Sequence, residues 1–151
     1  MRDLKVAAVC MHSEPGEILR NLDRTESYAS KASEMGAELI CFPELSISGY
    51  TLKHPLRVYG NLRPDGVIER IAQIAQEKAL IIIAGLIEIP DEEKPYISQI
   101  VAGPKGLLGT YRKTHLSPPE KETYGAGEQI NTFSHRDVAF GIQLCYESHF
   151  P

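Results

Sequence analysis

Three ionisable side chains of this 151-residue sequence stand at the ends of apolar stretches, where a cleft could reach them. Glu44 follows the run "AELICF" and a proline, Lys113 ends a strand of a predicted hairpin, and Cys145 ends the run "VAFGIQLC". A free thiol has a pKa of about 8.5 and is mostly protonated at neutral pH, so it needs a base or a cation beside it. A glutamate can take the proton, and a lysine can stabilise the thiolate and then an oxyanion. These residue types predict acyl transfer through Cys145, with the backbone N–H of Tyr146 as a second oxyanion donor.

Taken one at a time, each of these residues has a plainer interpretation. A lone loop glutamate is usually solvated, and a polar loop after Lys113 needs no chemistry to explain it. A cysteine in an apolar strand is usually a small hydrophobe, and we interpret Cys10 and Cys41 in that way. Cys145 differs because the polar stretch "ESH" follows almost at once, which places the thiol where a strand gives way to a loop.

Short apolar runs and a helical period alternate in the first half of the chain. The runs at residues 4–10, 37–42 and 79–89 have the length and composition of buried strands. A helix with a narrow apolar stripe is predicted between the first two, through Ile18, Leu22, Thr25, Ala29, Ala32 and Met35. Gly36 stands where that helix should end, and a second helix is predicted through residues 67–75. Strands joined by helices in this order predict βαβ units.

The second half of the chain has the pattern of hairpins. Residues 96–116 contain two apolar segments around the turn "GPKG", and residues 131–145 contain another pair that turns near 135–137. The predicted fold class is therefore α/β, with a mostly β layer and helices on its outside. No linker, repeat or low-complexity segment divides residues 1–151, which we treat as part of a single domain.

The order of the three reactive residues resembles the nitrilase superfamily, the carbon–nitrogen hydrolases. The resemblance is carried by "FPELSISGY", "YRKTHL" and "LCYESHFP". It implies an α-β-β-α sandwich in which Glu44 is the general base, Lys113 supports the oxyanion and Cys145 is the nucleophile. Members also use a second glutamate after the lysine. In "PPEKETYGAGE" Glu120 matches that position best, and Glu122 is a close competitor.

The resemblance also implies a reaction. A non-peptide carbon–nitrogen bond of a small carboxamide or N-carbamoyl compound would be hydrolysed through a cysteine thioester, without a metal or organic cofactor. A homo-oligomer is expected when the protein has its full length. Family members carry about as much chain again after the cysteine, so the sequence resembles the N-terminal portion of such a domain. A fragment or half of a split assembly, inactive alone, is therefore the alternative. It predicts an exposed apolar patch and an unpaired strand edge.

Composition excludes several other classes of protein. The net charge is −4 with acidic and basic residues interspersed, which argues against nucleic acid and anionic membrane surfaces as partners. No stretch approaches the roughly 18 apolar residues that span a bilayer, and the N-terminus lacks the features of a secretory signal. Three widely spaced cysteines without a CxxC pair argue against disulfides and zinc, so we expect a cytoplasmic protein.

Two local patterns allow other chemistry. Cys145 and His149 are four residues apart and could form a dyad or half of a metal site on a helix, although the preceding strand and Pro151 argue against a helix there. The glycines of "GPKGLLG" could suggest a phosphate loop, but the sequence lacks the Gly-Lys-Ser/Thr that such a loop needs. A hairpin turn explains these glycines better.

Overall fold

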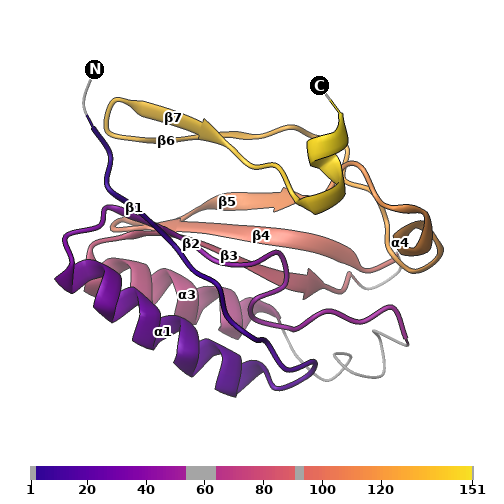
Figure 1. Ribbon diagram of the computed structural model, residues 1–151, viewed down its shortest axis with the longest axis horizontal. Helices are drawn as coiled ribbons and strands as arrows, with labels where there is room; N and C mark the ends of the chain where they lie inside the picture. Colours follow the sequence, from indigo (N-terminus) through magenta and orange to yellow (C-terminus); the bar gives the residue numbers. More distant parts are fainter. Residues whose placement is uncertain (1–2, 54–63, 91–93, 151) are drawn as a thin grey trace.

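The computed structural model describes residues 3–53, 64–90 and 94–150. Helices α1 and α3 cover one side of a five-stranded sheet, and a two-stranded hairpin lies over the other side (Figure 1). The α/β class is confirmed, and the described residues form one helical layer and two β layers. The elements in chain order are β1 (Val6–Ala8), α1 (Ile18–Glu34), β2 (Leu39–Cys41), α3 (Pro64–Lys78), β3 (Ile81–Glu88), β4 (Tyr96–Gly103), β5 (Gly106–Arg112), α4 (Pro118–Thr123), β6 (Thr132–His135), β7 (Val138–Gly141) and the 3₁₀ helix η1 (Cys145–His149).

The large sheet has the strand order β1-β2-β3-β4-β5. β1, β2 and β3 run parallel, as the predicted βαβ units require, and β3, β4 and β5 form antiparallel pairs. The turn between β4 and β5 is the predicted "GPKG" hairpin rather than a phosphate loop. Because the parallel strands end at one edge, the segment that follows β2 lies at the carboxyl end of the sheet, where ligands gather in open α/β folds.

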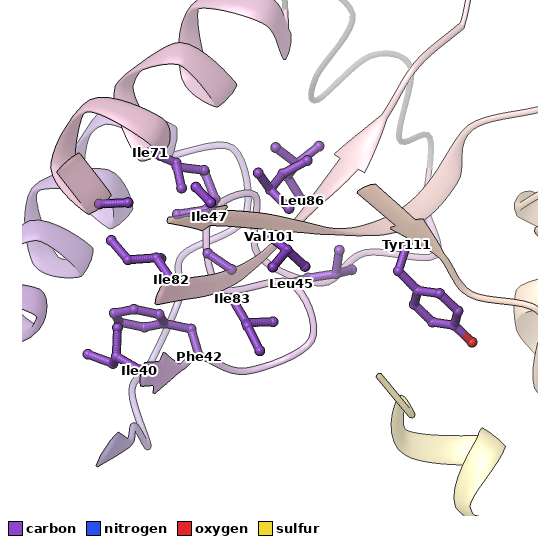
Figure 2. Packing of buried hydrophobic residues seen from close by; sticks show 14 of the residues in the cluster. Ile40, Phe42, Leu45, Ile47, Ile71, Ile82, Ile83, Leu86, Val101 and Tyr111 are labelled. Atoms are coloured by element: carbon purple, nitrogen blue, oxygen red, sulfur yellow. The ribbon is translucent and has the colours of Figure 1, made fainter. Parts of the chain in front are cut away.

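The core lies between the helices and the sheet (Figure 2). The predicted stripe on α1 is buried from Ile18 to Ala32, whereas its last member, Met35, is 70% exposed. The helix ends before Met35, because Gly36 adopts a left-handed φ of 74°. The N–H groups of Gly36 and Ala37 then reach back to the carbonyls of Ser33 and Ala32 at 2.9 Å, which closes the helix end.

Two predicted strands differ from the structure. The run 4–10 is not buried: β1 has only three residues, Val6 is 53% exposed and Cys10 is exposed. The reason is position, because β1 has one described neighbour, β2, and so has an unpaired edge. Cys41 is half-buried, so it agrees better than Cys10 with the prediction of a small hydrophobic residue in a buried strand.

The apolar run before Cys145 is likewise not one strand. β7 ends at Gly141, opposite Thr132 where β6 begins, so further residues have no strand to pair with. Side chains in β7 alternate between half-buried and exposed, and Phe133 of β6 makes the hairpin's buried contact, beside Gly109 of β5. Among the described residues, no helix has the length and apolar character needed to cross a bilayer.

Candidate active site

The loop that carries Glu44 is hydrogen-bonded along β3. The N–H of Ile47 donates to the carbonyl of Gly85 at 2.8 Å, and the N–H of Gly85 donates to the hydroxyl of Ser46 at 3.2 Å. The side-chain amide of Gln99 donates to the carbonyl of Glu44 at 2.7 Å. A Cβ at Gly85 would stand 1.6 Å from that same carbonyl oxygen, so only glycine permits this approach. These contacts therefore fix the backbone position from which the Glu44 side chain extends.

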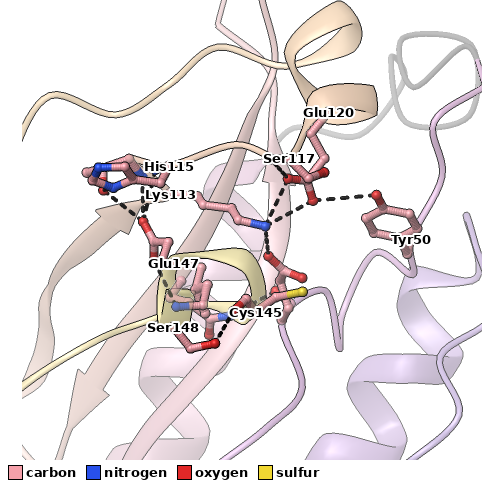
Figure 3. A network of polar contacts seen from close by, with 12 residues as sticks. Tyr50, Lys113, His115, Ser117, Glu120, Cys145, Glu147 and Ser148 are labelled. Carbon is pink, nitrogen blue, oxygen red and sulfur yellow. Dashed lines mark hydrogen bonds and ion pairs between the residues drawn. The ribbon is translucent and has the colours of Figure 1, made fainter. Parts of the chain in front are cut away.

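Lys113 follows β5 and has a completely buried side chain. Its Nζ donates to Oε1 of Glu44 at 2.6 Å and to both oxygens of Glu120 at 2.9 and 3.0 Å (Figure 3). Glu120 is the third residue of helix α4 and forms a capping box, since its carboxylate accepts the N–H of Ser117 at 2.7 Å. The Tyr50 hydroxyl adds a longer hydrogen bond of 3.4 Å to Glu120. An ammonium held between two carboxylates is the arrangement expected of buried charges, which must be paired.

The two carboxylates differ in their proton affinity. Burial raises the pKa of Glu44, and its contact with Lys113 offsets this only in part. Burial also acts to raise the pKa of Glu120, but hydrogen bonds from Ser117 and Lys113 outweigh it and hold that pKa below its usual value. Burial acts to lower the pKa of Lys113, and the hydrogen bonds to both glutamates raise it overall. Glu44 is thus the carboxylate better suited to take up and release a proton, beside a permanently charged lysine.

Cys145 begins the 3₁₀ helix η1 and is exposed. Its φ of 43° lies in the left-handed region, which costs a residue other than glycine about 1–3 kcal/mol and is concentrated at functional sites. In Figure 3 its sulfur lies on the side of the polar network where the Lys113 amine meets the carboxylates. In the described part of the chain the thiol has no hydrogen-bond partner. The N–H of Tyr146 lies in the first turn of η1, where backbone donors lack an acceptor within the helix.

The structure thus brings Glu44, Lys113 and Glu120 into direct contact, with Cys145 at their side. Glu122, the competing second glutamate, is an exposed residue of α4. A polar cavity of about 530 Å³ is lined by residues such as Glu88, Tyr96 and Arg112, and contains none of the predicted catalytic residues.

The sequence argues against a helix after Cys145, but the structure has one there, the short 3₁₀ helix η1. The ring of His149 packs against Tyr146, with ring centres 5.5 Å apart. Within residues 3–53, 64–90 and 94–150, no group of three or more His, Cys, Asp or Glu side chains is placed to hold a metal ion.

A sequence model of the carbon-nitrogen hydrolases matches residues 5–151. The chain belongs to this family. It is 31% identical over 152 residues to a nitrilase from Pyrococcus abyssi, covering 98% of this chain and 58% of that protein. It is 26% identical to an (R)-stereoselective amidase from Pseudomonas, covering 98% of this chain and 53% of that protein. The chain therefore spans about half the length of these curated relatives.

Solved structures of the same family share the fold. An amidase from Nesterenkonia superposes with a TM-score of 0.84 at 26% identity, over 97% of this chain and 57% of that one. A cysteine-to-alanine variant of the Nesterenkonia AN1 amidase in complex with butyramide gives a TM-score of 0.85 at 25% identity, over 97% and 57% of the two chains. The predicted nitrilase-type fold is confirmed by these superpositions.

Sequence reasoning missed several residues that hold this candidate site together. Asn21 on α1 is fully buried, and its amide donates to the carbonyls of Glu14 and Ile47 at 2.8 and 3.0 Å. It thereby ties the helix to the loop of Glu44. Gln99 and Glu147 are also buried polar residues with such roles. The sequence signal for such a residue is a polar side chain within an apolar face. In α1 that signal is one residue, Asn21, which is too little to predict a role.

Proposed function

We propose that the whole protein hydrolyses a non-peptide carbon–nitrogen bond of a small carboxamide or N-carbamoyl compound through a thioester on Cys145. The observation that carries this proposal is the buried Lys113, paired with Glu44 and Glu120 beside the thiol. The relatives add support, because they include amidases and a nitrilase, and one amidase variant binds butyramide. The proposal concerns the whole protein, since this chain spans about half the length of those relatives.

The first half of the reaction forms the thioester. Glu44 takes the proton of the Cys145 thiol, and the sulfur bonds to the carbonyl carbon of the substrate while the carbonyl electron pair moves onto oxygen. The Lys113 ammonium and the N–H of Tyr146 stabilise that oxyanion. When the tetrahedral intermediate collapses, the carbon–nitrogen bond breaks and the nitrogen leaves as ammonia or an amine, with the proton that Glu44 carried.

The second half releases the acid. Glu44 removes a proton from water, the oxygen bonds to the thioester carbon, and the carbon–sulfur bond then breaks. The proton returns from Glu44 to the sulfur, so the free thiol and the carboxylic acid are regenerated. Glu120 stays ionised throughout and holds the charged amine of Lys113 in position. We further propose a cytoplasmic enzyme that works as a homo-oligomer, on the grounds of composition and family resemblance.

Release of ammonia from small amides, nitriles and ureido acids by the whole protein tests this function. Cys145→Ala should abolish turnover, and Lys113→Ala should lower it by about 10²–10³-fold, the loss typical of one oxyanion donor. Glu44→Gln should be as severe, because it keeps the shape of the side chain and removes the base. Glu120→Gln should lower turnover and Glu122→Gln should not. Near-normal turnover of the Lys113 or Glu44 variant would reject the proposed roles.

A further inference from the structure

The carboxylate of Glu147 is buried and accepts five hydrogen bonds. Oε1 accepts the Tyr111 hydroxyl at 2.7 Å, the Thr114 N–H at 2.7 Å, the Thr114 hydroxyl at 2.8 Å and the His115 N–H at 3.2 Å. Oε2 accepts the N–H of Leu144 at 2.8 Å. No ion pair involves Glu147 within the described residues. These hydrogen bonds connect the carboxylate to two separate pieces of backbone and to the side chains beside one of them.

Those two pieces are the neighbours of the proposed reactive groups. Thr114 comes directly after Lys113, and Leu144 comes directly before Cys145. The two segments lie about thirty residues apart in the chain, and Figure 3 shows Glu147 between them. The Glu147 side chain thus links the strand end that carries the amine to the turn that carries the thiol.

Glu147 also holds the backbone shape at Cys145. Its own N–H donates to the carbonyl of Leu144 at 2.8 Å, while Leu144 donates back to its carboxylate. This reciprocal pair encloses Cys145, whose left-handed φ of 43° is a strained conformation for a side chain with a Cβ. Such strain persists only where surrounding contacts over-determine the backbone, and here Glu147 supplies two of those contacts.

We infer that Glu147 is a positioning residue of the active site: it fixes the Cys145 thiol relative to Lys113 without touching the substrate. The inference rests on the proposed function for its kinetic meaning. This role requires an ionised carboxylate. Hydrogen bonds from Tyr111, Leu144 and Thr114 outweigh the effect of burial and hold the pKa of Glu147 below its usual value. The side chain is then an acceptor toward all five donors at neutral pH.

Glu147→Gln in the whole protein tests the inference. An amide has one acceptor oxygen, so its NH₂ must face either Leu144 or the donors around Thr114, and one side of the bridge is lost. We expect kcat to fall about 10²-fold, the cost of a small misplacement of reacting groups, with KM changed by no more than about threefold. Glu69→Gln makes the same chemical change on an exposed glutamate of α3 and should leave both constants unchanged.

Thiol labelling gives a readout that needs no substrate. Brief iodoacetamide treatment followed by mass spectrometry compares Cys145 with Cys10, which is also exposed, and with half-buried Cys41. In Glu147→Gln the labelling rate of Cys145 relative to Cys10 should fall about tenfold or more, while Cys41 stays protected, as a misplaced thiol in a folded protein requires. Rapid labelling of Cys41 would instead report unfolding.

Two milder variants decide the matter if Glu147→Gln unfolds. Tyr111→Phe and Thr114→Val each remove one side-chain donor and keep the carboxylate, so each should lower kcat and the relative labelling of Cys145 by a smaller factor. Wild-type levels of both quantities in folded variants would overturn the inference. If the wild-type protein hydrolyses none of the amides, nitriles or ureido acids, the proposed function fails, and the labelling ratio still decides whether Glu147 positions the thiol.

Discussion

One methyl group added at Gly85 tests whether β3 holds the loop of Glu44 in place. In Gly85→Ala the new Cβ would lie 1.6 Å from the carbonyl oxygen of Glu44 and 2.5 Å from the amide nitrogen of Gln99. Real Cβ atoms essentially never come within 3.0 Å of such neighbours, so the loop and the strand must separate by at least about 1.4 Å. The obstacle is backbone rather than a flexible side chain, so it cannot turn aside.

The expected cost appears in two quantities. Overpacking of this kind lowers the free energy of unfolding by about 1–3 kcal/mol, and each kcal/mol lowers the melting temperature by about 2–4 °C at this size. The same displacement moves the Glu44 carboxylate away from Lys113, whose amine it contacts at 2.6 Å. A shift of about 1 Å at reacting groups costs about 10²-fold in turnover.

Thermal unfolding and ammonia release of the whole protein measure both effects. Gly66→Ala is the matched control, because its Cβ would meet nothing within 4 Å on helix α3. That variant should keep full turnover and gain about 0.5 kcal/mol, as alanine is the better helix residue. Equal melting temperatures and turnover in the two variants would refute the view that close backbone approach at Gly85 sets the position of Glu44.

Three further expectations concern charge and buried polar groups. Burial raises the pKa of Glu44 above 4.5, and the proposed base is its ionised form. We therefore expect kcat/KM to decline as the pH falls, with a midpoint above pH 4.5. A midpoint below pH 4.5 would contradict the assignment of Glu44 as the base. Asn21→Ala removes the donor to the carbonyls of Glu14 and Ile47, of which the second is buried. It should lower the free energy of unfolding in chemical denaturation by about 1–3 kcal/mol, against at most about 0.5 kcal/mol for the exposed Arg20→Ala. Burial acts to raise the pKa of Glu88, but bonds from Arg112 and Ser98 lower it overall, so this carboxylate stabilises the fold above its unfolded pKa. Glu88→Gln should therefore lower the melting temperature at neutral pH and make no difference well below pH 4.5, and an equal loss at both would argue against the ion pair.

The sequence predicted the framework well because periodicity reports which residues face an apolar layer. Both βαβ units and the hairpin of β4 and β5 follow from it. Periodicity does not report how many neighbours a strand has, so the sequence predicts a buried strand at residues 4–10, although β1 lies at an edge of the sheet. Nor does it report where a partner strand begins: β7 stops at Gly141 because β6 starts opposite it, at Thr132.

The candidate site was predictable to the extent that reactive residue types stand at strand ends. Glu44, Lys113 and Cys145 were found in that way, and their catalytic roles stay predictions. The preference for Glu120 over Glu122 came from a motif, and in the structure Glu120 alone of the two contacts Lys113, because the capping box turns it inward. The sequence does not reveal the role proposed for Glu147, since four of its five hydrogen bonds come from Tyr111, Thr114 and His115, more than thirty residues upstream, which no local pattern connects to it.

The long chain separations within the polar network also order the events of folding. β3, β4 and β5 pair with their neighbours in the chain, whereas Glu44 and Lys113 are 69 residues apart and Tyr111 and Glu147 are 36 apart. Contacts that close long loops carry a larger entropic cost and are slow to form. Strand pairing can thus precede the burial of Lys113, so a refolding chain would regain its circular dichroism before the contacts of Lys113 with Glu44 and Glu120 form. Between those two moments the sheet would be paired, while the side chains of the candidate site would not yet be in contact.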